Sequence, residues 1–190
     1  MTVTELRTPV SEETVRGLKL GDTVYLTGDV ITGRDEMHAR AVESAESGGP
    51  VPEGIEESVL YHCGPIVVSE GSGWKAIAAG PTTSARMNSL EPEMIRRFRI
   101  RAIIGKGGMS AEVGKAMSET GCVYLAAVGG TAVSLAESIV AIRGPEWSDL
   151  GMAEAMWRFE TDRLGPLTVA MDSDGNSLYE NVRSRLVRDI

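Results

Sequence analysis

Three stretches of the sequence decide the fold: residues 74–84 read WKAIAAGPTTS, residues 100–110 read IRAIIGKGGMS, and residues 122–132 read CVYLAAVGGTA. In each of them an apolar run ends in a glycine-containing turn, and a segment of helical composition follows. This order is typical of βαβ units, in which the strands are parallel and buried on both faces. The sequence therefore predicts an α/β fold with glycine-rich strand-to-helix turns.

The remaining elements follow from periodicity and from turn residues. Strands are predicted at 23–31, 59–68 (a strand, a turn and a second strand), 74–79, 100–104, 122–128 and 167–171. A short helix is predicted to begin at 11–14 and to end at Gly17 or Gly21, and further helices are predicted at 35–47, 85–97, 110–119, 132–138, 147–160 and 181–190. We expect the methionine and tryptophan side chains of 147–160 in the core or at a subunit interface, rather than around a cofactor.

The composition is that of a folded, acidic protein. Of the 190 residues, 42% are hydrophobic and 24% are charged, which argues against disorder and suits a single domain over residues 1–190. The net charge of −8 argues against nonspecific binding to nucleic acid or to an anionic membrane. The longest uncharged stretch, 120–136, is too short to span a bilayer, and residues 1–13 do not resemble a signal peptide. We therefore expect a soluble, cytoplasmic protein.

Cysteine and histidine are scarce. The two cysteines, Cys63 and Cys122, cannot form a disulfide framework, and with His38 and His62 they lack the paired spacing of a structural zinc site. An iron–sulfur cluster normally requires three or four thiolates, so this chain cannot hold one alone. We expect both cysteines to be buried thiols and His62 to be structural.

Three cations stand on the glycine-containing turns. Lys106 lies between two glycines, Arg86 comes one helical turn after Thr82, and Arg34 follows the predicted strand 23–31. Backbone N–H groups at helix starts favour an anion, and parallel strands would bring these turns to one edge of the sheet. A bound anion would also offset the cost of Arg86 in the first turn of a helix. Together the cations indicate a dianionic ligand such as a dicarboxylate.

Competing interpretations remain for single features. Any one glycine turn can serve only to let the chain bend sharply. His38 follows Arg34 by four residues, so it either orients the site or lies on a helix surface. The basic run 96–101 could bind nucleic acid, but at the end of a helix it is better explained as a complement to the helix dipole or as a subunit contact. No P-loop, dinucleotide fingerprint or serine nucleophile elbow is present in the sequence.

Four motifs together resemble a known family. They are GRDEMH (33–38), YHCGP (61–65), GPTTSARM (80–87) and GKGGM (105–109). The chain resembles, over nearly its whole length, the β subunit of class I fumarase and L(+)-tartrate dehydratase, which are iron–sulfur-dependent hydro-lyases. The resemblance implies a swivelling β/β/α domain. It also implies that a [4Fe–4S] cluster is bound by three cysteines of a partner α subunit, which agrees with the absence of cluster ligands here.

The resemblance also implies roles for individual residues. Arg34, Arg86 and Lys106 would bind the carboxylates of the substrate, and Lys106 would also act in catalysis. From its position four residues after Arg34, we also place His38 among the candidate substrate-binding residues. Thr82 would transfer the proton with an aspartate of the α subunit, although Thr83, one residue away, is not excluded.

The expected reaction is the reversible hydration of fumarate to L-malate in an α2β2 assembly. The alternatives are the dehydration of tartrate or another 2-hydroxy diacid, and a noncatalytic anion-binding or assembly domain. Because the chain would hold only half of the site, we expect it to be inactive alone, where it could form a homodimer.

Overall fold

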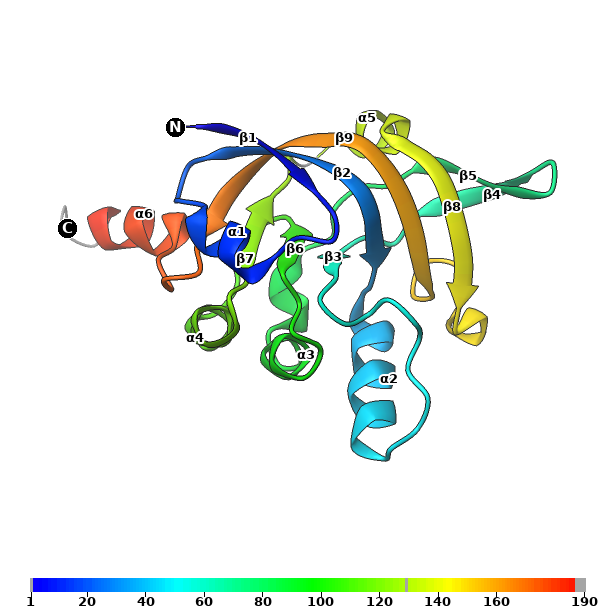
Figure 1. Cartoon of the computed structure of the whole chain (residues 1–190), viewed down its shortest axis with the longest axis horizontal. Coiled ribbons are helices and arrows are strands. Elements are labelled where there is room, and N and C mark those ends of the chain that lie inside the picture. Colours follow the sequence, from blue (N-terminus) through cyan, green and yellow to red (C-terminus); the bar gives the residue numbers. More distant parts are fainter. Residues whose placement is uncertain (1, 129, 187–190) are drawn as a thin grey trace.

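The computed structural model describes residues 2–128 and 130–186, and Figure 1 shows a curved sheet with helices packed along it. Its strands are β1 (Val3–Arg7), β2 (Thr23–Thr32), β3 (Val59–Tyr61), β6 (Ala102–Gly105), β7 (Val123–Ala126), β8 (Ile139–Glu146) and β9 (Met156–Met171). Their spatial order is β1-β2-β3-β6-β7-β9-β8. Because β2 also pairs with β9, five of these strands close into a ring.

Helices and a separate hairpin complete the described chain. The helices are α1 (Glu12–Gly17), α2 (Asp35–Glu46), α3 (Glu91–Phe98), α4 (Ala111–Thr120), α5 (Ala132–Glu137) and α6 (Leu178–Leu186), with single 3-10 turns η1 (Ser84–Met87) and η2 (Ser148–Leu150). The hairpin consists of β4 (Ile66–Glu70) and β5 (Gly73–Ala78), which pair antiparallel. In Figure 1, α2, α3 and α4 lie together on one side of the sheet.

The strand directions confirm the α/β prediction. Strands β1, β2, β3, β6 and β7 run parallel to one another. The long strand β9 runs antiparallel to β2, β7 and β8. The predicted strand–turn–helix units that begin at 100–104 and 122–128 are therefore confirmed. Their apolar runs are buried on both faces, as is typical of parallel strands.

Two apolar layers stabilise the fold, one on each face of the strands. Ile104, Leu125 and Phe159 belong to the layer inside the ring. Ile103 and Tyr124, their neighbours along the strands, belong to the layer beneath α2, α3 and α4. Since successive side chains of a strand point to opposite faces, each short strand contributes to both layers.

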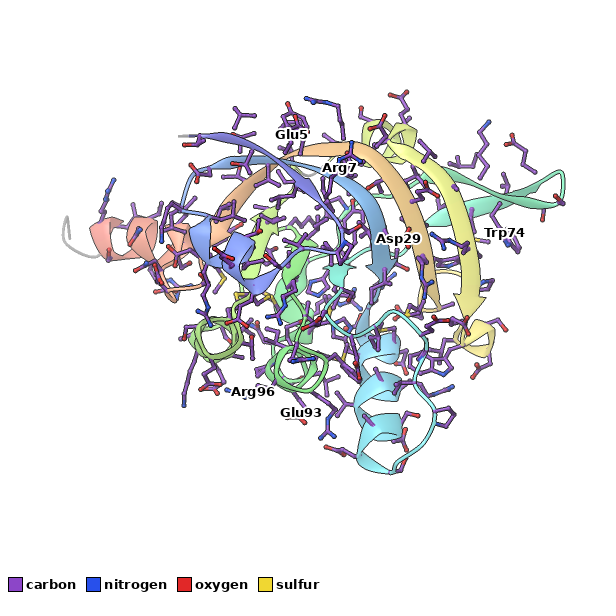
Figure 2. The ribbon with its side chains drawn as sticks, in the orientation of Figure 1. Glu5, Arg7, Asp29, Trp74, Glu93 and Arg96 are labelled. Carbon is purple, nitrogen blue, oxygen red and sulfur yellow. The ribbon has the colours of Figure 1, made fainter. Side chains whose placement is uncertain are left out.

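The first predicted βαβ unit is wrong. The run 74–79 forms β5 of the exposed hairpin, and Trp74, labelled in Figure 2, lies on the side away from α2, α3 and α4. A short apolar run cannot by itself distinguish a buried strand from a hairpin strand. The predicted helix 85–97 is divided into η1 and α3. Pro92 has no N–H to donate within a continuous helix, and in the first turn of α3 that N–H would have no partner in any case.

The prediction for 147–160 is also wrong, since this segment contains η2 and the start of β9. Its apolar spacing arises because Met156, Trp157 and Phe159 are buried on the two faces of β9. The expectation that these side chains lie in the core is therefore confirmed. Met152 is exposed.

Two edge strands, β1 and β8, were not predicted. Most of their side chains are exposed, so their sequences carry little hydrophobic pattern. The helix predicted at 181–190 is confirmed as far as 186, and residues 187–190 lie outside the described residues. Within the described residues, none of the helices has both the length and the apolar character needed to cross a membrane.

Truncation of the fully buried Phe159 tests the two-layer core. Phe159→Ala removes an aromatic side chain from the middle of the ring, and we expect the free energy of unfolding to fall by about 3–5 kcal/mol. Urea denaturation of the full chain measures this change. Val182→Ala on α6 is the control, because Val182 is exposed and its truncation should change stability by less than about 0.5 kcal/mol. Equal losses in both variants would contradict this description of the core.

Candidate functional site

The site is built at the carboxyl ends of three adjacent parallel strands. Strands β2, β3 and β6 are hydrogen-bonded neighbours of the same direction, so their carboxyl ends meet at one edge of the sheet. Arg34 follows β2, His62 follows β3, and Lys106 follows β6. This edge is where α/β folds generally place their ligands.

A short segment, residues 81–84, is inserted between the ends of β3 and β6. The Thr82 N–H donates to the His62 carbonyl at 2.7 Å, and the Ser84 N–H donates to the Lys106 carbonyl at 3.1 Å. The Lys106 N–H in turn donates to the Thr82 carbonyl at 3.4 Å. Thr82 and Lys106 therefore come together as the glycine turns predicted, but through these backbone hydrogen bonds and not through a parallel strand at 74–79.

Glycine is required where this segment makes its closest approach. A Cβ atom on Gly105 would lie 1.9 Å from Ser84 Oγ and 2.8 Å from the Tyr124 hydroxyl, far inside van der Waals contact. On Gly64 it would lie 2.6 Å from Nη1 of Arg34. These two glycines therefore allow the inserted segment and the Arg34 guanidinium to pack directly against backbone.

The two arginines at the site are held by carboxylates of the chain itself. Asp35 accepts from Nη2 and Nε of Arg86 at 2.6 and 3.2 Å, and Nε of Arg34 lies 3.2 Å from a Glu154 oxygen. A guanidinium has five N–H donors, so each pairing orients the arginine and leaves other donors available. The side chain of Arg86 is 49% exposed and that of Arg34 is 22% exposed.

The placement of Arg86 corrects the dipole argument. Arg86 lies in a single 3-10 turn, not in the first turn of a longer helix, and Asp35 already neutralises it. No bound anion is needed to explain its position. Lys106 differs from both arginines, because among the described residues it has no ion-pair partner within 4.0 Å. Lys106 is thus a cation of this edge whose charge no carboxylate of the described residues neutralises, and we call it uncompensated.

Thr82 is partly buried and Thr83 is exposed, so both threonines lie close to the surface beside Lys106. Cavities of about 420 and 440 Å³ lie elsewhere, beside the β4-β5 hairpin and beside Gly28 respectively. The candidate site is thus an open rim, defined by Arg34, Thr82, Arg86 and Lys106.

His38 does not reach this rim. Its ring is fully buried, Nδ1 contacts the Arg34 carbonyl at 2.7 Å, and Nε2 contacts Glu91 Oε2 at 3.0 Å. His38 therefore lies neither on an exposed helix face nor where it could touch a substrate at the rim, and both of these expectations are corrected. His38 lies one layer beneath the rim, where it supports the backbone that carries Arg34.

A buried polar cluster that the sequence did not reveal surrounds His38. His62 Nε2 lies 2.9 Å from the same Glu91 oxygen, and His62 Nδ1 lies 2.9 Å from Ser84 Oγ. Tyr124 donates its hydroxyl hydrogen to Ser84 at 2.9 Å. Glu91 was missed because an acidic residue before Pro92 is an ordinary helix start, so its sequence context carries no sign of a buried role.

The protonation of the cluster follows from burial and from the central carboxylate. Burial disfavours the ionised carboxyl, but His62 and His38 outweigh it and lower the pKa of Glu91 to about 2. Burial likewise opposes the charge of His38, yet Glu91 prevails and raises the pKa of His38. For His62, burial prevails and lowers the pKa. These directions favour a charged His38 beside Glu91 and a neutral His62.

The two cysteines are buried thiols, as expected. Cys63 and Cys122 have no exposed surface, and burial raises the pKa of the Cys63 thiol to about 12. Burial also raises the pKa of the Cys122 thiol. Because iron–sulfur clusters are bound by thiolates, neither residue fits a cluster.

Arginines of the basic run 96–101 form ion pairs with carboxylates of the same chain. Arg96 pairs with Glu112 and Glu119 of α4, and the buried Arg101 lies 2.8 Å from Glu57. Figure 2 shows Arg96 on the outer side of α3, away from the sheet. These ion pairs explain the run without nucleic acid.

Comparison with known proteins identifies the family of this chain. The family model described as the fumarase C-terminus matches residues 1–182, and the chain belongs to this family. A Methanocaldococcus jannaschii protein provisionally named L(+)-tartrate dehydratase subunit beta is 46% identical over 93% of this chain and 91% of its own length. The L(+)-tartrate dehydratase subunit beta of Escherichia coli K12 is 36% identical over 91% of this chain and 85% of its own.

A longer relative carries the same region as part of its chain. The Geobacillus stearothermophilus protein provisionally named fumarate hydratase class I is 39% identical over 95% of this chain, which covers 34% of that protein. The region described here is thus found both as a separate subunit and within a larger polypeptide.

Substitution of Gly105 tests the insertion of residues 81–84. We expect Gly105→Ala to lower the free energy of unfolding by about 1–3 kcal/mol, because the added methyl group overlaps Ser84 Oγ and forces the segment outward. Gly17→Ala is the matched control, since a Cβ there meets nothing within 4 Å and should leave stability unchanged or slightly raised. Chemical denaturation followed by circular dichroism compares the variants, and an unchanged midpoint for Gly105→Ala would count against the close approach.

Proposed function

We propose that this chain, as a single domain over residues 1–190, is the β subunit of an iron–sulfur-dependent hydro-lyase that interconverts fumarate and L-malate. Membership of the fumarase C-terminus family supports the reaction class. The observation that carries the proposal is the juxtaposition of Thr82 and the uncompensated Lys106 at the sheet edge that also bears Arg34. A cationic edge of this kind suits a substrate with two carboxylates.

The proposed roles follow from the charges of the reaction. Removal of a proton next to a carboxylate develops negative charge on that carboxylate, and fixed cations that stabilise it lower the barrier. Lys106 supplies a point charge, and the donors that Asp35 and Glu154 leave available on Arg86 and Arg34 hold the substrate. Thr82 transfers the proton onward to an aspartate of the α subunit, and Thr83, one residue away and more exposed, is the alternative.

The remaining parts of the site belong to a second chain in this proposal. Since the thiols of Cys63 and Cys122 do not fit a cluster, the [4Fe–4S] cluster is assigned to the α subunit. Relatives named as beta subunits support the existence of that partner. The proposed assembly is an α2β2 enzyme of the cytoplasm, with this chain as its swivelling β/β/α domain and with a homodimer as the form the isolated chain could take.

The second candidate is an L(+)-tartrate dehydratase β subunit. It is favoured by the Methanocaldococcus and Escherichia relatives, which match this chain over most of their own lengths. Both candidates use a 2-hydroxy diacid and therefore the same cationic edge. The two substrates differ in the second hydroxyl of tartrate.

Assays of the reconstituted enzyme separate these functions. We expect the chain, co-expressed anaerobically with its α subunit, to convert L-malate to fumarate faster than it dehydrates L(+)-tartrate, and to be inactive alone. Ultraviolet absorbance of fumarate and chromatographic detection of oxaloacetate measure the two products. Faster turnover of tartrate would establish the second candidate, and turnover of neither would leave an anion-binding or assembly domain.

Removal of the Lys106 charge tests the catalytic edge. In the α/β complex, we expect Lys106→Ala to lower kcat by about two to three orders of magnitude, because the developing charge loses its nearest uncompensated cation. Lys115→Ala is the control, since Lys115 lies exposed on α4 and its loss should leave kcat unchanged. A Lys106→Ala complex with normal kcat would remove Lys106 from the mechanism.

A further inference from the structure

A continuous row of buried polar groups lies directly beneath the rim. It consists of His38 on α2, Glu91 on α3, His62 after β3, Ser84 on η1 and Tyr124 on β7, and all five residues are completely buried. Each group comes from a different element, so the row exists only in the folded chain. Buried polar groups are costly unless they are paired, which makes a row of five in one place unusual.

The hydrogens on the His38 side can be assigned from the partners. The Arg34 carbonyl can only accept, so Nδ1 of His38 carries a hydrogen. Nε2 faces the Glu91 carboxylate at 3.0 Å and carries the second hydrogen. His38 is therefore an imidazolium paired with a carboxylate, consistent with the raised pKa of His38 and the lowered pKa of Glu91.

The hydrogens on the His62 side run in one direction. Tyr124 donates to Ser84, so the Ser84 hydroxyl is free to donate its own hydrogen to Nδ1 of His62. Nε2 of His62 then carries the ring hydrogen and lies 2.9 Å from Glu91 Oε2, a close contact without the alignment of a hydrogen bond. Hydrogen bonds thus lead from Tyr124 through Ser84 to His62, and a 2.9 Å contact joins His62 to Glu91, whose charge His38 balances.

The other titratable groups around the row do not disturb this assignment. Asp35 on α2 lies on the side of His38 and favours its charged form. Cys122 and Tyr124 approach Glu91 from β7 and the residue before it, and burial raises the pKa of both, so they stay protonated at neutral pH. Arg34 contributes its carbonyl to the row, while its guanidinium pairs with Glu154.

A metal ion is the competing explanation for two histidines and a glutamate whose ligand atoms lie within 4.8 Å of one another. However, both Nε2 atoms converge on the same carboxylate oxygen, at 3.0 and 2.9 Å. That oxygen occupies the space between the two rings, which is the place a shared cation would need. The geometry therefore favours protons over a metal.

The row is attached to the rim at two places. At one end, His38 contacts the carbonyl of Arg34. Nearer the Tyr124 end, Ser84 lies two residues beyond Thr82, and the Thr82 N–H is bonded to the carbonyl of His62. The segments that carry Arg34 and Thr82 are therefore connected from below by charges and hydrogen bonds, not by apolar packing alone.

We propose that His38, Glu91, His62 and Ser84 are positioning residues, which use one buried imidazolium–carboxylate pair and one neutral histidine to hold Thr82 in register with Arg34 for the hydro-lyase reaction. The inference rests on the proposed function. In contrast to the rim residues, these four groups touch no substrate. Their effect is exerted on geometry, where a displacement of about 1 Å can cost about 100-fold in rate.

Nitrogen NMR of the imidazole rings in the full chain tests the protonation without any turnover. At pH 7.5 we expect His38 to carry hydrogens on both nitrogens, and His62 to carry one, on Nε2. In Glu91→Gln the countercharge is lost, so His38 should lose one ring hydrogen at this pH. A neutral His38 in the unmodified chain, or one equivalent of metal in the purified protein, would overturn the inference.

Turnover of the α/β complex tests the positioning role. We expect Ser84→Ala to lower kcat about 10- to 100-fold with little change in KM, because Thr82 loses its register while the cations remain. Ser173→Ala is the matched control, since Ser173 is also buried and its hydroxyl has no hydrogen-bond partner among the described residues, so kcat should not change. Circular dichroism verifies that both variants fold. Equal kcat values for the two variants would overturn the inference.

The turnover and NMR measurements distinguish failure of the proposed function from failure of the inference. An unmodified complex that turns over none of the diacids would refute the proposed function, and with it the positioning role in that reaction, whatever the NMR result. An active complex whose His38 is neutral would refute only the inference.

Discussion

The backbone hydrogen bonds that insert residues 81–84 between the ends of β3 and β6 are the constraint on which the site depends. The two strands are hydrogen-bonded to each other up to His62 and Ile104. Beyond that point the inserted segment supplies the hydrogen-bond partners, one for the His62 carbonyl and others for the backbone of Lys106. Buried N–H and C=O groups are costly when unpaired, so this arrangement leaves few alternatives for the segment. Its consequence is that Thr82 and Lys106, 24 residues apart in sequence, become direct neighbours.

Beneath this segment, the chain buries the His38–Glu91 pair, whose side chains are completely buried. A buried ion pair seldom gains enough Coulomb energy to offset the loss of hydration of both groups. The His38–Glu91 pair is therefore better explained by the orientation it imposes than by stability. Its carboxylate contacts both histidines, and each histidine holds backbone or a hydroxyl that belongs to the rim.

The rim itself shows how cations can be kept ready for a ligand. Asp35 and Glu154 hold Arg86 and Arg34 in defined orientations, whereas Lys106 has no carboxylate among its described neighbours. Surface ion pairs of this kind contribute little to stability, so their value lies in limiting the rotamers of long side chains. The open rim, together with buried thiols that do not fit a cluster, is what a shared site would require of one of its two halves.

The sequence by itself determined two of the strands that are buried on both faces and the cations that follow strands of the sheet. Residues 100–104 and 122–128 could be predicted because continuous apolar runs bounded by glycine are local signals, and Lys106 and Arg34 were found through the strands they follow. The family motifs were also local. Only the tertiary structure decided that 74–79 is a hairpin strand, that Asp35 neutralises Arg86, and that His38 is buried against Glu91. The physical reason is range: periodicity reports the few residues along one element, whereas pairing between elements and the protonation of a buried group depend on which distant segments are packed around them.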